Sequence, residues 1–96
     1  MKWYVYILAC DNHSLYVGHT QDLSVRFDRH RRGSGAAHTA VHAPTTILYH
    51  EFFSAELEAI QREQQLKRWS HAKKQALIAG DKERLHQLSK SHYEIE

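Results

Sequence analysis

The chain has 96 residues and a formal net charge of +2, with 42% hydrophobic and 25% charged residues. This length allows one domain, and this composition excludes a disordered, collagen-like or linker-like chain. A single cysteine, Cys10, excludes a disulfide framework within the chain and indicates a reducing compartment, for which we expect the cytoplasm. The longest apolar run, Trp3 to Cys10, is too short for a membrane helix, so no membrane partner is expected.

The first 20 residues predict a β-hairpin. Residues 3–8 and 15–18 are rich in aromatic and β-branched side chains, and a turn cluster separates them at 11–14. Side chains alternate between the two faces of a strand. If the aliphatic residues of both strands face one core, Tyr6 and Tyr16 must share the opposite face.

A helix is predicted next, over residues 23–32. Asp22 is a suitable N-cap for it, and Arg26 and His30 stand four residues apart, along one edge of the helix. A loop rich in glycine, alanine and histidine follows and ends at Pro44. The helix therefore brings a guanidinium and an imidazole to the same side.

The second half of the chain predicts one strand and then helices. Residues 45–53 have strand composition, and Ser54 is expected to cap a helix over 55–69. Shorter helices are expected from Ser70 to near Gly80 and from Asp81 onward. The fold class is therefore α+β, a small three-stranded antiparallel sheet flanked by helices in the order β-β-α-β-α-α, with a C-terminal helical extension.

The apolar residues of these helices are expected core positions, although some could instead form a dimer face. We expect a monomer or a weak homodimer. The residues are Leu57, Ile60, Leu77, Ile78, Leu85 and Leu88.

Glu63 is an acid within an apolar helical stripe, one turn from Ala59 and from Leu66. A carboxylate at such a position must be paired or bound to a cation. Two interpretations are open. The acid forms a structural ion pair, with Arg62, Lys67 or an arginine from elsewhere, or it binds a divalent metal.

Two tyrosines on one sheet face, an Arg–His pair and an isolated glutamate suit phosphodiester cleavage. The arginine fork binds phosphate oxygens, and a single carboxylate can hold a divalent ion that keeps most of its waters. A phenol or an imidazole can orient or deprotonate water. Each group alone is a weak signal, because tyrosines in a hairpin usually serve packing.

Two tripeptides resemble the paired signature of the GIY-YIG endonuclease superfamily, namely Tyr-Val-Tyr at 4–6 and Tyr-Val-Gly at 16–18. In that family an arginine stands eight residues after the second glycine, as Arg26 does after Gly18. A histidine or tyrosine follows four residues later, which His30 matches.

The later part of the chain extends this resemblance. Glu63 matches the metal-binding glutamate of the family, and residues 58–79 resemble its small single-domain bacterial branch, which is related to the catalytic module of the UvrC excision nuclease. We expect residues 1–80 to form the nuclease-like domain and residues 81–96 to be a helical extension and tail of it.

The resemblance implies hydrolysis of DNA phosphodiester bonds with one Mg²⁺ or Mn²⁺ ion. Carried over by position, it implies that Tyr6 and Tyr16 lie beside the attacking water, with one of them a candidate general base. It also implies that Arg26 stabilises the phosphate, that His30 orients groups or shuttles protons, and that Glu63 anchors the metal.

The chain departs from the family pattern at three positions. Tyr4 stands where the superfamily name has glycine, and His19 where the UvrC module often has lysine. His19 could still accept a proton from Tyr16. His38 stands where the small branch often has tyrosine. The identity of the general base, among the tyrosines and histidines, therefore stays open.

Two basic clusters indicate an anionic partner, most often nucleic acid, although solvated helix faces have a similar composition. Residues 22–35 hold four arginines and two aspartates, and residues 62–74 hold five basic residues and one glutamate. Such residues would contact DNA phosphates without reading bases, so we expect cleavage of branched, nicked or single-stranded DNA in repair or recombination. The candidates are Arg29, Arg31, Arg32, Lys67, Arg68, Lys73 and Lys74.

Two further function classes remain open. One is a nucleic-acid-binding module with a degenerate nuclease site. The other is a zinc protein, using the pairs Cys10/His13 and His38/His42. The zinc hypothesis is the weaker of the two, because one thiol and a histidine pair in an irregular loop are poor matches to zinc-ligand spacing.

Overall fold

The computed structural model describes residues 2–32 and 44–95. The strands are β1 (Trp3–Cys10), β2 (Leu15–Thr20) and β3 (Pro44–Phe53), and the helices are α1 (Leu23–Arg31), α3 (Glu56–Lys67), α4 (His71–Ala79) and α5 (Lys82–Ile95). This order confirms the predicted α+β class. The predicted loop before Pro44, with His38 and His42, lies outside the described residues.

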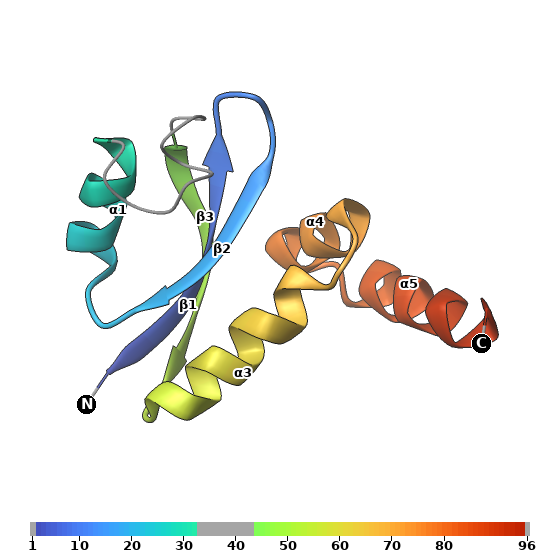
Figure 1. Ribbon diagram of the computed structural model, residues 1–96. Helices are drawn as coiled ribbons and strands as arrows, with labels where there is room; N and C mark the ends of the chain where they lie inside the picture. The colour runs from blue at the N-terminus through green and yellow to red at the C-terminus, as the bar shows by residue number, and fades with distance from the viewer. Residues whose placement is uncertain (1, 33–43, 96) are drawn as a thin grey trace.

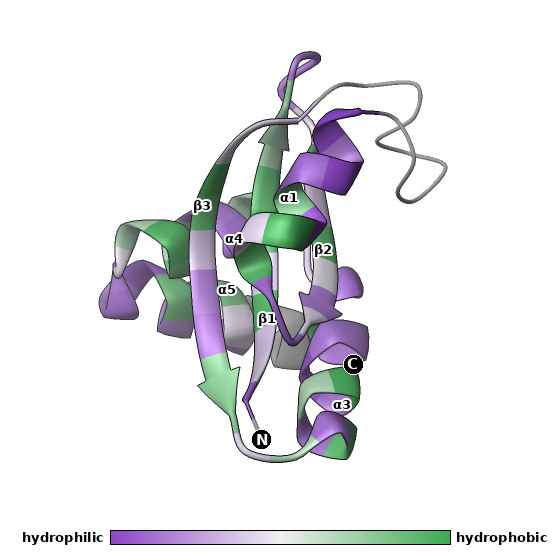
Figure 2. Cartoon of the chain, turned by 90° about the vertical axis from the view of Figure 1, so that its left-hand side faces the viewer, coloured by the Kyte–Doolittle hydropathy of each residue, from purple (hydrophilic) through white to green (hydrophobic). Residues whose placement is uncertain are grey.

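The three strands form one antiparallel sheet in the order β2-β1-β3, so β1 is central and β2 is an edge strand. Helix α1 covers one face of the sheet, and α3 and α4 lie on the other side (Figure 1). Figure 2 shows α1 crossing the sheet face, with α4 and α5 behind the strands. Within the described residues, no helix has the length and apolar character to cross a membrane.

The main core lies between the sheet and α3. Val5, Ile7 and Val17 point to this side and pack with Ala59 and Leu66 of the helix, all of them buried. This arrangement follows from the strand alternation and from the apolar stripe of α3. It fixes which face of α3 meets the sheet, and therefore where Glu63 points.

The hairpin register puts the two tyrosines on one face, as predicted, and that is the face covered by α1 (Figure 1). Tyr6 lies opposite Gly18, and Leu8 lies opposite Tyr16. Tyr6 and Tyr16 are therefore diagonal neighbours, with ring centroids 6.3 Å apart.

Several helix ends follow the predicted local chemistry. The Asp22 carboxylate accepts from the Val25 N–H at 3.1 Å, and the Ser70 hydroxyl oxygen accepts from the Lys73 N–H at 3.1 Å. Gly80 ends α4 in the left-handed conformation, with φ of 70°.

Two predictions about α3 are wrong. Its N-cap is Ala55, with no side-chain capping hydrogen bond, instead of Ser54. The helix start relies on Glu56 and Glu58, whose charges favour the N-terminal end of the helix dipole. Leu57, expected in the core, is 65% exposed because it lies off the face that carries Ala59.

Candidate active site

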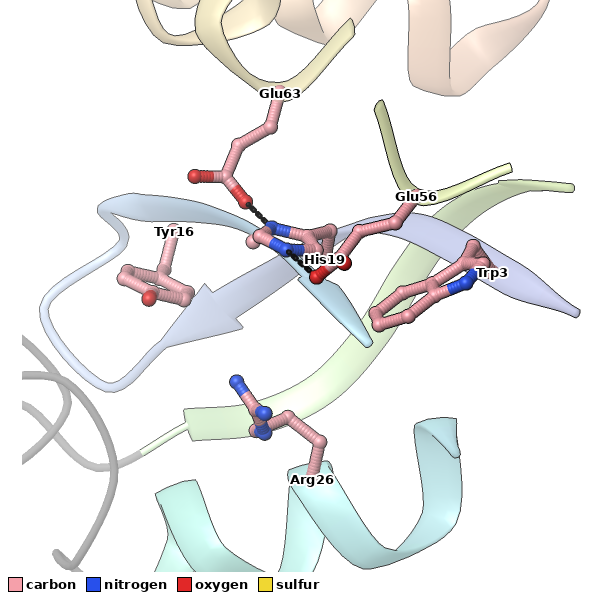
Figure 3. Close-up of a pocket in the computed structure, with 7 residues that line it drawn as sticks. Trp3, Tyr16, His19, Arg26, Glu56 and Glu63 are labelled. Atoms are coloured by element: carbon pink, nitrogen blue, oxygen red, sulfur yellow. Dashed lines mark hydrogen bonds and ion pairs between the residues drawn. The ribbon is translucent and has the colours of Figure 1, made fainter. Parts of the chain in front are cut away.

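A pocket of about 280 Å³ opens beside β2. Because β2 is an edge strand, its alternating side chains bring groups from both sheet faces to the same opening. Tyr16 and Arg26 come from the α1 side, and Glu63 comes from α3 on the other side (Figure 3). The lining residues are Trp3, Tyr16, Gly18, His19, Arg26, Glu56 and Glu63.

Glu63 holds its carboxylate at this pocket through two contacts. Its Oε1 lies 2.6 Å from Nδ1 of His19, and its Oε2 lies 2.9 Å from Nζ of Lys67. The other ring nitrogen of His19 lies 3.7 Å from Glu56 Oε2, so the imidazole stands between two acids (Figure 3). The ion pair with Lys67 was one of the structural interpretations of Glu63, and the same carboxylate also faces the pocket.

Tyr6 and His30 form a buried pair behind the pocket. The Tyr6 hydroxyl and His30 Nε2 lie 2.9 Å apart, and each residue is 1% exposed. Burial raises the pKa of Tyr6 far above its ordinary value, and burial together with the charge of Arg26 lowers the pKa of His30. Both groups are therefore neutral at pH 7.

Tyr16 is the phenol of the two that lines the pocket. Its ring packs on His30, with centroids 4.8 Å apart. Burial raises the pKa of Tyr16, while the charges of Lys67 and Arg26 oppose that shift and the charge of Glu63 adds to it. The charges of Lys67 and Arg26 thus favour the ionised form of Tyr16, whereas burial favours its neutral form.

Gly18 is required by the packing of the two tyrosines. A Cβ atom at this position would lie 2.7 Å from Cζ of Tyr6, closer still to the Tyr6 hydroxyl, and 3.1 Å from Cε2 of Tyr16. Such contacts are closer than van der Waals packing allows. The glycine of the second tripeptide therefore has a steric reason, which is to leave room for the Tyr6 hydroxyl beside His30.

The candidate DNA-contacting residues near α1 are at its C-terminal end. Arg31 and Arg32 pair with Asp28 at 2.8 and 2.9 Å, and both are mostly exposed. Arg29 is exposed as well. Exposed ion pairs of this kind are weak, so these guanidinium groups can exchange partners with phosphates.

The candidates around α3 and α4 differ in their surroundings. Lys67 is paired with Glu63, and Lys73 lies 4.2 Å from the Trp69 ring centroid. Burial lowers the pKa of Lys74. Arg68 is exposed at the end of α3.

One polar network beside the site was not predicted from the sequence. Arg62 donates two hydrogen bonds of 2.9 Å to the carboxylate of Glu51, and the Tyr49 hydroxyl donates to the same carboxylate at 2.5 Å. Arg62 had been a candidate partner of Glu63, but its guanidinium instead joins α3 to β3.

Glu56 and Trp3 were also missed as pocket residues. Glu56 precedes Glu63 by two helical turns, and this spacing could have identified it as a second acid on the same face. Trp3 packs beside His19, with ring centroids 5.8 Å apart. No comparable pattern in the sequence marks Trp3 as a pocket residue.

The residues of the pocket fit a single hydrated divalent ion. Mg²⁺ usually keeps several waters and binds one or two carboxylates together with substrate phosphates. Glu63 offers such a carboxylate at the pocket, with Glu56 nearby. The protein would thus supply few of the ligands itself. Across residues 2–32 and 44–95, no group of three or more His, Cys, Asp or Glu side chains is arranged to hold a metal.

Comparison with known proteins gives the class of this fold and site. The model of the GIY-YIG catalytic domain matches residues 2–76. The chain therefore belongs to the GIY-YIG family, a nuclease class whose members generally use divalent metal ions.

Its relatives include other small proteins. The chain is 38% identical over 78 residues to a UPF0213 protein of Staphylococcus saprophyticus, covering 81% of this chain and 95% of that protein. It is 40% identical over 75 residues to a UPF0213 protein of Staphylococcus aureus, covering 78% and 92%. The solution NMR structure of a UPF0213 protein from Bacillus halodurans is similar, with a TM-score of 0.53 and 35% identity over 82% of this chain and 84% of that one. The chain is thus a small single-domain member of the superfamily.

Proposed function

We propose that this protein is a metal-dependent endonuclease that hydrolyses DNA phosphodiester bonds at the pocket beside β2. One observation carries the proposal, the meeting of Tyr16, His19, Arg26 and Glu63 at a single opening. These residues come from three elements, β2, α1 and α3, so their meeting is a property of the fold. A phenol, a guanidinium, an imidazole and an acid are the groups that phosphodiester hydrolysis needs.

Each group has a role that follows from its chemistry. The Arg26 guanidinium binds non-bridging oxygens of the phosphate and stabilises the charge that develops on them. Glu63 anchors the Mg²⁺ or Mn²⁺ ion. When bound, that ion supplies Lewis-acid stabilisation of the phosphate and of the leaving oxygen.

We assign to Tyr16 the positioning of the attacking water. Its hydroxyl lines the pocket and can hold the water by a hydrogen bond, whereas the Tyr6 hydroxyl is buried against His30. His19 lines the same pocket and can take up the proton. Tyr6 and His30 then act as positioning residues, because they support the ring of Tyr16 from behind.

The DNA is held by basic side chains on both sides of the pocket. We assign Arg29, Arg31 and Arg32 to one flank of the phosphate backbone. The other flank is assigned to Lys67, Arg68, Lys73 and Lys74. Contacts of this type give affinity without sequence readout, so the substrate class is branched, nicked or single-stranded DNA, as repair or recombination would present.

A nicking assay tests the proposal. Supercoiled plasmid and labelled flaps, forks and nicked duplexes are incubated with the full chain, with Mg²⁺ or Mn²⁺ or with a chelator. We expect metal-dependent cleavage that Glu63→Ala reduces at least about 10²-fold, as loss of a group that stabilises the transition state does. DNA binding in a gel shift should be kept.

The matched control is Glu58→Ala, which makes the same change on an exposed turn of the same helix. It should cleave like the unaltered protein. Equal cleavage by Glu63→Ala would remove the metal role of this residue. Binding without cleavage of every DNA structure would favour a non-catalytic binding module instead.

A further inference from the structure

The carboxylate of Glu63 is engaged on both oxygens, and the second partner is a lysine of its own helix. Lys67 follows Glu63 by four residues, a spacing that makes helical side chains neighbours, and its Nζ lies 2.9 Å from Oε2. From the sequence, Lys67 was expected either to pair with Glu63 or to contact flanking phosphates. In the structure its ammonium contacts Glu63, the residue that we propose as the metal ligand.

Lys67 also acts on the phenol across the pocket. After burial, which raises the pKa of Tyr16, the charge of Lys67 is the largest influence on that phenol, and it lowers the pKa. The Lys67 side chain is 49% exposed, whereas that of Glu63 is 15% exposed. The ammonium thus has room to swing outward while the carboxylate stays in place.

An ammonium and a divalent ion cannot share this oxygen. A divalent ion such as Mg²⁺ binds carboxylate oxygen at about 2.1 Å, so an ammonium held on the same oxygen would stand within a few ångströms of it. Like charges at that separation repel strongly in a partly buried site. One of the two cations must leave.

Resting on the nuclease function proposed above, we propose that Lys67 occupies Oε2 of Glu63 in the metal-free protein and competes with the divalent ion for this carboxylate. Displaced from Glu63, the ammonium binds a DNA phosphate at the mouth of the pocket. Lys67 is thus a positioning residue that couples the two ligands. By linkage, metal binding strengthens DNA binding, and DNA binding strengthens metal binding by the same factor.

The first test measures Mn²⁺ binding to the full chain without DNA, by electron paramagnetic resonance of free Mn²⁺. Lys67→Met should bind Mn²⁺ about three- to fivefold more tightly, the size expected when a part-exposed ion pair no longer competes. Lys82→Met removes the same charge at the first residue of α5 and should stay within about twofold of the unaltered protein. Lys67→Gln is a second variant, expected to change in the same direction as Lys67→Met.

The second test measures DNA affinity against salt with Ca²⁺ as a probe ion. The unaltered protein should gain affinity with Ca²⁺ and show a salt slope steeper by about one phosphate contact, and Lys67→Met should lack this extra contact.

Unchanged or weaker Mn²⁺ affinity of both Lys67 variants, relative to Lys82→Met, would overturn the competition. Tight Mn²⁺ binding that survives Glu63→Gln in the Lys67→Met background would overturn it as well. Equal salt slopes with Ca²⁺ would overturn the transfer to phosphate. These readouts need no cleavage, so the nicking assay judges the nuclease function separately.

Discussion

Arg62 donates two parallel hydrogen bonds of 2.9 Å to the Glu51 carboxylate, one from Nε and one from Nη2. The pair ties α3 to β3, and the next residue along the helix is Glu63. Both side chains are largely buried, at 23% and 20% exposure, and bidentate geometry makes this the strongest kind of protein ion pair. The acid at the pocket thus depends on a contact made by the residue that precedes it in the helix.

Replacing Arg62 should therefore loosen α3. Arg62→Ala leaves the largely buried Glu51 carboxylate without its arginine partner and removes the guanidinium that lies 5.2 Å from the centroid of the Trp69 ring. We expect a loss of about 2–3 kcal/mol in the free energy of unfolding by urea titration. Arg31→Ala, at an exposed pair on α1, is the control and should cost under about 1 kcal/mol. Similar losses for both variants would contradict this account.

The same pair predicts an acid-dependent stability. Burial alone would raise the pKa of Glu51, but hydrogen bonds from Arg62 and Tyr49 and the charge of Arg62 outweigh it, so the pKa falls below its ordinary value of 4.5. A carboxylate with a lowered folded-state pKa contributes stability that is present above the unfolded pKa and is lost as the pH falls through the folded one.

Unfolding measured across the acid range should show this loss. The advantage of the unaltered protein over Glu51→Gln should be full at pH 6 and should shrink as the pH falls below about 4.5. Comparing the two proteins cancels the other carboxylates. A constant difference from pH 6 to pH 3 would show that the pair does not shift this pKa.

The sequence predicted what depends on local pattern. Strand alternation placed Tyr6 and Tyr16 on one face, and Asp22 and Ser70 cap their helices because an N-cap needs only a side-chain oxygen and the next turn. It did not predict the partner of Arg62, because Glu51 is eleven residues away and meets it only through the packing of α3 on the sheet.

The sequence also could not predict which of the two site tyrosines is buried, for a similar reason. The motif gives Tyr6 and Tyr16 equal weight, but only the tertiary fold decides that Tyr6 lies under α1 with His30 while Tyr16 faces the pocket.

A side chain at Gly18 should displace the Tyr6 hydroxyl. The added Cβ of Gly18→Ala would overlap the end of the Tyr6 ring and press on the ring of Tyr16. Overpacking of this kind costs about 1–3 kcal/mol, and loss of the hydrogen bond to His30 adds to it. Urea unfolding should therefore shift strongly, and nicking should fall with it.

Gly80→Ala separates this overlap from backbone strain. A Cβ at Gly80 meets nothing within 4 Å, and the only expected cost comes from its φ of +70°, about 1 kcal/mol. If Gly18→Ala lowered the free energy of unfolding no more than Gly80→Ala does, this would show that the two tyrosine rings can shift to accommodate a methyl group, which would contradict the proposed overlap.

The two tyrosines should separate stability from catalysis. Tyr16→Phe removes a hydroxyl at the pocket, so nicking should fall about 10²-fold while the unfolding free energy changes by less than about 1 kcal/mol. Tyr6→Phe removes the buried hydrogen bond between the Tyr6 hydroxyl and His30 Nε2 and should cost about 1–3 kcal/mol of stability. Its cleavage should fall less than that of Tyr16→Phe. The reverse ranking in the nicking assay would reassign the water to Tyr6.

Helix α5 should be dispensable for the nuclease fold. It packs against α4 and extends away from the sheet (Figure 1), and the pocket takes its lining from residues 3–63. A chain ending at Gly80 keeps all of α4 (His71–Ala79), including Leu77 and Ile78, which pack on the core.

We expect this shortened chain to unfold in one cooperative transition and to nick DNA within about threefold of the full chain, because it keeps the central core and the whole pocket. A shortened chain ending at Trp69, which lacks α4 as well, is the comparison and should lose the transition, since it exposes the core under Leu77 and Ile78. Loss of cooperative unfolding in the chain ending at Gly80 would make α5 part of the domain core instead of an extension.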